Sequence, residues 1–319
     1  MSSIERSAGI VLVFMAAAGM LAAMSQEDAP RRPACLVIAH RGGCGLGPEN
    51  TLEAAAAGHA AGADLWELDA QLCKDGVPVL LHDETLGRTT DVRKVFPDRA
   101  GRPVGEFTLA ELKRLDAGSW WALGQGGKAL AEGRISKERL ALYGSGRVRV
   151  PTLEEALELT RELGWRVNVE IKSPAPGSLG RLVPEVLAVI RKTGMASRAA
   201  VSCFDHAVCL AVARSPEPRP RVQVLQSGRL ARPERYVKEI VGAEAFNPSL
   251  SSLGLGGADE AMGEPDPALV LGRLRQAGLE VNVWTVNRPE QFETLIRLGV
   301  TGIITDRPDL LRAFLAGRR

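Results

Sequence analysis

Residues 35–72 read CLVIAHRGGCGLGPENTLEAAAAGHAAGADLWELDAQL, and this stretch has the pattern of a strand, a helix and a second strand. The two apolar runs, 35–39 and 65–72, have the length of buried strands, and an alanine-rich helical segment lies between them. A helical crossover lets two strands lie parallel, in a sheet that is covered on both faces. The stretch therefore predicts the repeating unit of an α/β fold.

The same alternation continues to the C-terminus. Candidate strands occupy eight short apolar runs, at 35–39, 65–72, 166–171, 199–204, 221–225, 244–246, 280–286 and 302–305. Helix N-caps are predicted at Asn50, Thr152 and Asn287, because each stands three residues before a glutamate. Eight strands that alternate with helices close naturally into a (β/α)8 TIM barrel, which is the fold we expect. A doubly wound sheet, the alternative, normally has fewer strands and a nucleotide-type glycine loop.

A long segment after the second strand breaks the alternation. Lys74, Asp75 and Gly76 predict a turn that leads to residues 77–81, so that a strand extension or a hairpin delivers His82 and Asp83. The polar segment 84–150 follows, and it is too long for a plain connection. We expect it to form a small insertion over the barrel mouth, within a barrel domain of residues 33–319.

Residues 1–25 differ from the rest of the chain. Glu5 and Arg6 precede an uncharged, mostly apolar run over 9–23, and Ala23 with Ser25 supplies the small residues of a cleavage site. This pattern predicts a signal peptide or an uncleaved N-terminal membrane anchor. We therefore expect a protein that is exported, periplasmic or secreted, or that associates with a membrane through its N-terminus.

Composition limits the kinds of partner. Forty basic and 38 acidic residues leave a net charge of only +2, so the chain lacks the broad basic face that nucleic-acid binding requires. A small anionic molecule would have to be recognised by a few placed groups. The five cysteines are few and odd in number, so disulfides are not the framework of the fold, although one pair could form after export. The sequence gives no indication of the oligomeric state.

Three acidic side chains are predicted to meet at adjacent strand ends. Glu67 and Asp69 are two residues apart on one strand and so project to the same side, and Glu170 ends the next strand. Carboxylates side by side in apolar runs repel one another, and a divalent cation such as Mg²⁺ or Ca²⁺ would offset that cost. The alternative is a structural ion network in which Arg41 and Lys172 neutralise the acids.

Two of the four histidines also follow apolar runs at strand ends. His40 and His82 would converge on the acids, whereas His59 lies in a helix and His206 opens one. Imidazole titrates near neutral pH and suits general acid and base work. Hydrolysis of a phosphodiester needs a base for the entering oxygen, an acid for the leaving oxygen, and cations for the other phosphoryl oxygens.

The remaining motifs support a phosphate site without a nucleotide fold. The glycines of GGCGLG, residues 42–47, lack the G-x-G-x-x-G register, so their expected role is to let backbone pass close to a bound phosphate. Trp284 is expected either to fill the barrel core or to wall the site and contact the alcohol moiety of a substrate.

Taken in order, five blocks resemble those of the glycerophosphodiester phosphodiesterase family. They are HRGGCGLGPENTLEA, GADLWELDAQLCKDGVPVLLHDETLGRTT, VNVEIK, VNVWTVN and GIITDRPD, and they span about Leu36 to about Leu310. The resemblance implies a (β/α)8 barrel with a small insertion after strand two. It also implies hydrolysis of glycerophosphodiesters to an alcohol and sn-glycerol 3-phosphate with a divalent metal, Ca²⁺ or Mg²⁺.

The resemblance also implies roles for the candidate residues. By position they are the catalytic histidines His40 and His82, the phosphate-binding cations Arg41 and Lys172, and the metal ligands Glu67, Asp69 and Glu170. The preferred assignment has His40 as the base and His82 as the acid, and the entering oxygen comes from water or from the substrate's own glycerol hydroxyl. Cys73 replaces a usual threonine, and Cys44 in the glycine loop could make activity sensitive to oxidation.

Two other functions remain open on sequence alone. A phospholipase C- or D-like enzyme of the same barrel type would act on intact phospholipids and would need an apolar rim, for which Trp120 and Trp121 are candidates. A non-catalytic anion- or sugar-binding protein could also have kept the fold.

Overall fold

The computed structural model describes residues 35–172, 179–255 and 266–318. The predicted signal peptide or anchor, residues 1–25, lies outside the described residues. Within these ranges, no helix has both the length and the apolar character needed to cross a membrane.

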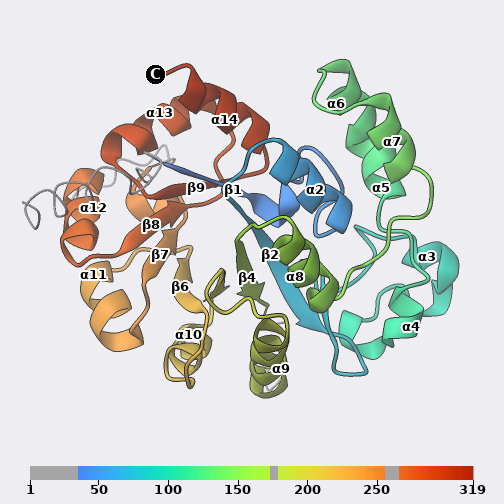
Figure 1. The fold of residues 1–319 in the computed structure, drawn as a ribbon, viewed down its shortest axis with the longest axis horizontal. Helices are drawn as coiled ribbons and strands as arrows, with labels where there is room; N and C mark the ends of the chain where they lie inside the picture. The colour runs from blue at the N-terminus through green and yellow to red at the C-terminus, as the bar shows by residue number, and fades with distance from the viewer. Residues whose placement is uncertain (1–34, 173–178, 256–265, 319) are drawn as a thin grey trace, which may run out of the picture. The chain divides into compact units, whose positions relative to one another are not determined.

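Eight parallel strands form a closed barrel (Figure 1). They are β1 (Leu36–Ala39), β2 (Leu65–Leu72), β4 (Val167–Ile171), β5 (Ala199–Cys203), β6 (Arg221–Gln226), β7 (Ala245–Pro248), β8 (Glu280–Val283) and β9 (Gly302–Thr305). Each strand pairs with the next parallel strand along the chain, and β1 pairs with both β2 and β9, which closes the sheet. The predicted TIM barrel is therefore confirmed.

One strand ends earlier than predicted. The run over 280–286 is a strand only to Val283, because the chain then leaves the regular β8–β9 ladder. Trp284 N donates to Pro248 O at 3.2 Å, and Val286 N donates to Ile304 O at 3.0 Å. An apolar run alone does not show where a ladder ends.

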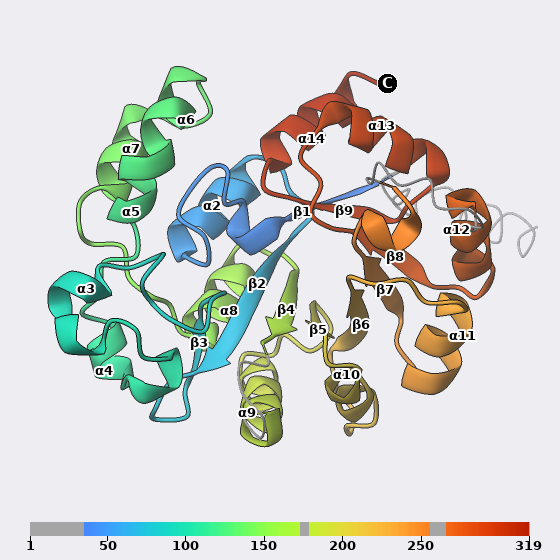
Figure 2. The same ribbon diagram turned by 180° about the vertical axis from the view of Figure 1, so that it is seen from behind.

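Helices surround the barrel (Figures 1 and 2). They are α2 (Leu52–Ala60), α8 (Leu153–Glu162), α9 (Leu179–Lys192), α10 (His206–Ala213), α11 (Pro233–Arg235) with the π-turn η5 (Tyr236–Val241), α12 (Pro267–Gln276), α13 (Pro289–Leu298) and α14 (Pro308–Ala316). Two 3₁₀ turns, η1 (His40–Gly42) and η6 (Ser251–Leu253), lie between strands and helices. Thr152 caps α8 with Glu155 in a capping box, as predicted.

The other two predicted caps are wrong. Thr51 rather than Asn50 caps α2, with its Oγ1 accepting from Ala54 N at 3.1 Å. Helix α13 begins at Pro289 with no side-chain cap. Asn50 and Asn287 instead form hydrogen bonds at the candidate site described below.

The side chains of strand β2 alternate between the helix-covered face of the sheet and the barrel interior. Trp66 and Leu68 belong to the apolar layer between sheet and helices, where Trp66 stacks on Trp165 with centroids 6.1 Å apart and donates to Thr160 Oγ1 at 2.9 Å. Glu67 and Asp69 alternate with them and therefore point into the barrel. One face of the strand thus points two acids into the barrel interior, and the other face packs core residues against the surrounding helices.

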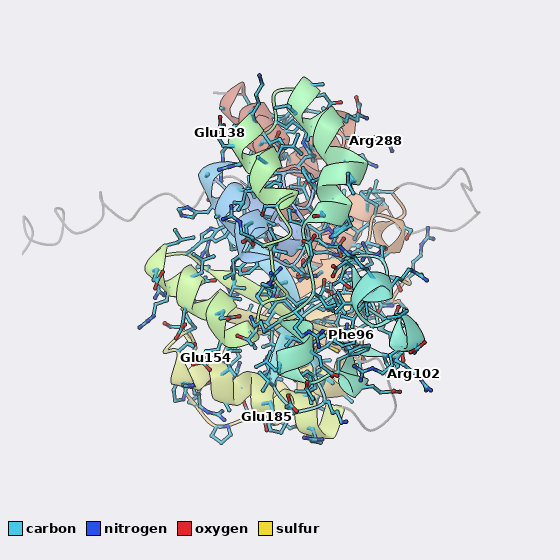
Figure 3. All side chains as sticks on the ribbon, turned by 90° about the vertical axis from the view of Figure 1, so that its right-hand side faces the viewer. Phe96, Arg102, Glu138, Glu154, Glu185 and Arg288 are labelled. Atoms are coloured by element: carbon cyan, nitrogen blue, oxygen red, sulfur yellow. The ribbon has the colours of Figure 1, made fainter. Side chains whose placement is uncertain are left out.

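A hairpin and an insertion follow β2. Strand β3 (Pro78–Leu80) pairs antiparallel with β2, which is the hairpin of the two alternatives, and returns the chain to His82. The insertion contains α3 (Val92–Val95), η2 (Pro97–Arg99), η3 (Val104–Glu106), α4 (Leu109–Leu112), α5 (Ser119–Trp121), η4 (Ala122–Gly126), α6 (Gly127–Ala131) and α7 (Lys137–Tyr143). It lies beside α2 and α8, and Figure 3 views it from outside.

The insertion also supports the loop after β1. Trp121 Nε1 donates to Cys44 O at 2.8 Å, and Arg134 donates to Gly45 O. The 42–47 loop is therefore held between the insertion and helix α2.

The glycine loop passes very close to helix α2. Gly42 has φ +88°, and a Cβ there would meet Ala55 N at 2.8 Å. Arg41 just before it also has a positive φ of 51°, which is uncommon for a residue with a Cβ. Its backbone N–H donates to Glu67 Oε2 at 2.9 Å, which holds this conformation.

We expect Gly42→Ala to destabilise the fold far more than Gly146→Ala. Both glycines have positive φ, but a Cβ at Gly146 would meet nothing within 4 Å. The Gly146 variant should lose about 1 kcal/mol from backbone strain, whereas Gly42→Ala adds a steric cost of about 1–3 kcal/mol. Urea unfolding of both variants measures the difference, and equal losses would contradict the close packing.

Candidate active site

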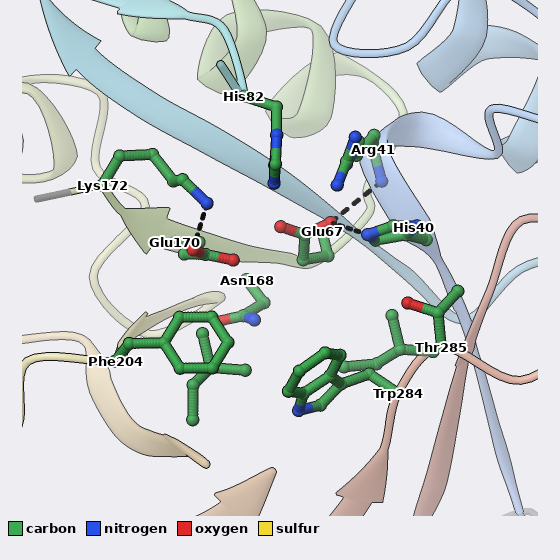
Figure 4. A pocket seen from close by; sticks show the side chains of 12 residues that line it. His40, Arg41, Glu67, His82, Asn168, Glu170, Lys172, Phe204, Trp284 and Thr285 are labelled. Atoms are coloured by element: carbon green, nitrogen blue, oxygen red, sulfur yellow. Dashed lines mark hydrogen bonds and ion pairs between the residues drawn. The ribbon is translucent and has the colours of Figure 1, made fainter. Parts of the chain in front are cut away.

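The predicted site residues meet at the carboxyl ends of β1, β2 and β4 (Figure 4). His40 and Arg41 lie in η1 directly after β1, and His82 follows β3. The cavity there is lined by His40, Arg41, Glu67, His82, Glu170, Lys172 and Trp284, together with five further residues. Asp69 lies beneath Arg41 and Lys172, so every residue expected at the site is present there.

The three acids form one compact, buried cluster. Asp69 pairs in register with Glu170, and one oxygen from each of Glu67, Asp69 and Glu170 lies within 4.8 Å of the others. Their exposed fractions are only 4%, 1% and 8%. Glu67 Oε1 and Asp69 Oδ1 accept no hydrogen bond from any described residue, although buried carboxylate oxygens normally do.

Burial and mutual repulsion disturb the titration of these acids. Burial, followed by the charge of Asp69, raises the pKa of Glu67 to about 8. The same two causes raise the pKa of Glu170 to about 7, in spite of Lys172. Burial would also raise the pKa of Asp69, but Lys172 and Arg41 outweigh it and hold that pKa below its ordinary value. The protein alone therefore provides too little positive charge for three carboxylates.

Two cations flank the acids. Lys172 Nζ lies 2.7 Å from Glu170 Oε1 and 3.5 Å from Asp69 Oδ1, and Arg41 Nε lies 3.5 Å from Asp69 Oδ2. This is part of the ion network that we considered as the alternative. Among the residues that the structure describes, it leaves Glu67 without a cationic partner closer than His40, whose Nε2 is 4.0 Å from Oε2. The network is therefore incomplete by itself.

The donor set suits a divalent cation of the Ca²⁺ or Mg²⁺ type. All three candidate ligands offer carboxylate oxygens, and two of these oxygens lack a hydrogen-bond partner. A second group, His40, Cys44 and Asp306, also brings possible ligand atoms together. Its atoms are already joined by hydrogen bonds, with Cys44 Sγ and His40 Nδ1 both bonded to Asp306 Oδ1.

His40 is oriented by an aspartate from the far end of the chain. Its Nδ1 donates to Asp306 Oδ1 at 2.6 Å, which turns Nε2 toward the acids. Burial lowers the pKa of His40, but the hydrogen bond to Asp306 and the charge of Glu67 outweigh it, so the pKa lies above its ordinary value. Burial would raise the pKa of Asp306, but the hydrogen bond with His40 and the charge of His40 outweigh it and lower that pKa to about 2.

His82 is held in the same way by its neighbour. Its Nδ1 lies 2.8 Å from Asp83 Oδ1, and Arg88 Nε donates to Asp83 Oδ2 at 2.6 Å. Burial, with Arg41 and Lys172, lowers the pKa of His82 in spite of Asp69 and Asp83. Each histidine thus uses Nδ1 for a carboxylate and keeps Nε2 for the cavity.

Arg88 and Glu49 connect the His82 side of the site to Arg41. Arg88 Nη1 donates to Glu49 Oε2 at 2.7 Å, and Glu49 Oε1 accepts from Arg41 Nη1 at 2.9 Å. A continuous chain of ion pairs therefore runs from His82 through Asp83, Arg88 and Glu49 to Arg41. It fixes the guanidinium of Arg41 relative to the imidazole of His82.

Sequence reasoning missed several of these supporting residues. Asn50 Nδ2 donates to Asp69 Oδ2 at 2.7 Å, and Asn287 Nδ2 donates to Asp306 Oδ2 at 2.6 Å. Both asparagines precede helices, so their local pattern indicated caps. The signal that could have found Asp306 is its position, since it directly follows the last strand in GIITD.

Trp284 lines the cavity, and part of it packs against the apolar cluster of Ile38, Leu65 and Ile304. Its Nε1 donates to Asn247 O at 2.7 Å, and its ring meets Phe204 edge-on at 5.3 Å and 87°. Phe204 is 44% exposed, and both rings line the cavity on the side opposite His82 (Figure 4). Trp284 thus lines the cavity, and its contact with a substrate stays a prediction.

Other local expectations change in the structure. Trp121 is fully buried against Tyr143, and Trp120 is half-buried with Nε1 bonded to Ala117 O, so the pair forms no exposed apolar rim. Burial and the neighbouring Asp306 raise the pKa of Cys44 well above its ordinary value, which argues against an oxidation-sensitive thiolate. All five cysteines are free in the part of the chain that the structure describes.

The chain matches known proteins along most of its length. The model of the glycerophosphoryl diester phosphodiesterase family covers residues 40–310. A glycerophosphodiester phosphodiesterase of Caldanaerobacter subterraneus subsp. tengcongensis is 33% identical over 86% of this chain and 96% of that protein. One from Bacillus altitudinis is 32% identical over 86% of this chain and 95% of that protein.

The fold matches a solved structure with a bound product. A phosphodiesterase of Oleispira antarctica in complex with sn-glycerol-3-phosphate has a TM-score of 0.66 and 26% identity, covering 88% of this chain and 96% of that one. The closed barrel, the site at its carboxyl end and the family match over 40–310 agree. The chain belongs to the glycerophosphoryl diester phosphodiesterase family.

Proposed function

We propose that the protein hydrolyses glycerophosphodiesters to an alcohol and sn-glycerol 3-phosphate with the help of one divalent cation. The observation that carries the proposal is the arrangement of Glu67, Asp69 and Glu170, whose oxygens lie within 4.8 Å of one another between two imidazoles. Family membership, the two relatives and the product named for the Oleispira enzyme support this substrate class.

The three acids would hold the cation. When bound, a Ca²⁺ or Mg²⁺ ion supplies positive charge to the phosphoryl oxygens and neutralises charge that develops during the reaction. Arg41 and Lys172 border the same cavity and are available to contact the remaining oxygens. Both keep their charge, because the surrounding acids outweigh burial and raise the pKa of each.

The two histidines would move the protons. With Nδ1 fixed on Asp306, His40 Nε2 is directed at the cavity and would accept the proton of the entering oxygen. The entering oxygen belongs either to water or to the substrate's glycerol hydroxyl. His82, fixed on Asp83, would give its proton to the leaving alcohol.

The first prediction of the proposed function concerns substrates. Glycerophosphocholine and glycerophosphoethanolamine should both be hydrolysed when Ca²⁺ or Mg²⁺ is present, whereas intact phospholipid should not be. A chelator should remove at least 90% of the activity, since the positive charge that the cation supplies to the phosphoryl oxygens is then missing. The measurement is the release of sn-glycerol 3-phosphate, and undiminished turnover in chelator would contradict the proposal.

The second prediction separates ion binding from folding. Glu67→Gln should lower kcat by at least about 100-fold, which is about 2.7 kcal/mol of transition-state stabilisation. The ion-free variant should melt no lower than ion-free wild type at pH 8.5, because a buried acid with a raised pKa is replaced by a neutral group. Calcium should raise the melting temperature of wild type but not of the variant. A variant that retains full activity would count against Glu67 as a ligand.

The third prediction follows from the raised pKa values of Glu67 and Glu170. In the ion-free fold these acids bind protons that the unfolded chain has lost, so their contribution to stability decreases as pH rises through about 7 to about 8. Cation binding must displace those protons. Calcium should therefore bind more tightly at pH 8.5 than at pH 6, with proton release at pH 6.5 that nearly vanishes at pH 9. Calorimetry in two buffers tests this, and pH-independent affinity would contradict it.

A further inference from the structure

A second cavity lies beside the site, between the β2–β3 hairpin, η3 and the start of α9. It offers about 250 Å³, compared with about 150 Å³ for the cavity that holds the acids. Gln71, Lys74, Glu84 and Arg181 line it. None of these four side chains has a role in the mechanism given above.

Gln71 joins this cavity to the backbone on both sides of His82. The side-chain Nε2 of Gln71 donates to Leu81 O at 2.8 Å and to Asp83 O at 2.7 Å, the two carbonyls that flank His82. Gln71 also follows Asp69 by two residues on β2, so it lies about 7 Å further along the same face of the strand. A group that extends from the acids along this face of β2 would therefore pass Gln71 and enter the second cavity.

The charged residues that line the cavity, Lys74, Glu84 and Arg181, are exposed to solvent. Lys74 and Arg181 form no ion pair with any residue in the described ranges, and the Arg181 guanidinium lies over Gly76, where a Cβ would meet Nη2 at 2.9 Å. Glu84 is the acid among them, two residues after His82. The Oε1 of Gln71 is buried at the cavity wall with no hydrogen-bond partner. Two cations and one acid therefore line the same cavity with no ion pair between them, beside a buried acceptor that lacks a partner.

We propose that this second cavity is the head-group subsite, and that it selects head groups carrying both an anion and a hydrogen-bond donor, as serine does. The inference rests on the proposed hydrolase function and on His82 as the acid, because the leaving alcohol must then lie on the His82 side. The carboxylate of a serine head group would meet Lys74 and Arg181. Its ammonium group would meet Glu84.

The opposite wall suits the other half of the substrate. Phe204 and Trp284 lie across the acids from His82, and their ring faces favour the C–H groups of glycerol (Figure 4). Trp284 would then contact the glycerol, and not the leaving alcohol. A substrate would span from this aromatic pair, past the three acids, to the second cavity.

Three substrates separate the contributions to selectivity. Glycerophosphoserine has a donor and an anion, glycerophosphoethanolamine has the donor alone, and glycerophosphocholine has neither. For wild type, kcat/KM should decrease in that order, with glycerophosphoserine on the order of tenfold above glycerophosphocholine. The double variant Lys74→Ala/Arg181→Ala should bring glycerophosphoserine down to the level of glycerophosphoethanolamine while glycerophosphocholine stays within about twofold.

Controls distinguish failure of the subsite from failure of the function. Lys137→Ala removes an exposed cation on α7, outside the cavity, and should change none of the three rates. Calorimetry with His40→Ala in Ca²⁺ measures head-group binding without turnover, so it tests the subsite even if wild type hydrolyses nothing. Equal binding of glycerophosphoserine and glycerophosphocholine there, or an equal loss on all three substrates in the double variant, would overturn the inference.

Discussion

Repulsion among three buried carboxylates is the constraint on which the site depends. The pleat of β2 turns Glu67 and Asp69 into the barrel, and the register with β4 sets Glu170 opposite Asp69. Water cannot screen the charges at this depth, so either two of the acids are protonated or a cation is bound beside them. The raised pKa values of Glu67 and Glu170 and the two unpartnered oxygens are both consequences of this one arrangement.

Much of the surrounding structure keeps that arrangement fixed. Asn50 bonds both the side chain and the backbone N–H of Asp69, and the strained Arg41 donates its own N–H to Glu67. The glycine loop can hold Arg41 there because Gly42 permits contact with α2 and because the insertion binds the loop from outside. The insertion therefore contributes to the chemistry by supporting a loop, besides any effect on substrate access.

The two histidines follow one design although they come from unrelated segments. Each uses Nδ1 for an aspartate and presents Nε2 to the cavity, but Asp83 is the next residue after His82 whereas Asp306 lies 266 residues after His40. Their pKa values move in opposite directions in the ion-free site. At His40 burial lowers the pKa, but the hydrogen bond to Asp306 and the charge of Glu67 outweigh it. At His82 burial, helped by Arg41 and Lys172, lowers the pKa in spite of Asp69 and Asp83. A divalent ion between them would repel protons from both rings.

The barrel and its acids could be predicted because their signals are local. Apolar runs show strands, and a carboxylate in such a run is conspicuous. Partners such as Asp306, Arg88 and Asn50 could not be identified in this way, since only the closed sheet brings them to the site and Asn50 has the same local pattern as a cap. The end of β8 could not be predicted for a related reason, because Trp284 bonds to β7 and so lies at the cavity wall.

Anomalous diffraction from crystals soaked in Mn²⁺ tests the three-carboxylate metal site without relying on activity. We expect one strong peak, bounded by oxygens of Glu67, Asp69 and Glu170. A peak at His40, Cys44 and Asp306 instead, or no peak at the three acids at saturating Mn²⁺, would contradict it.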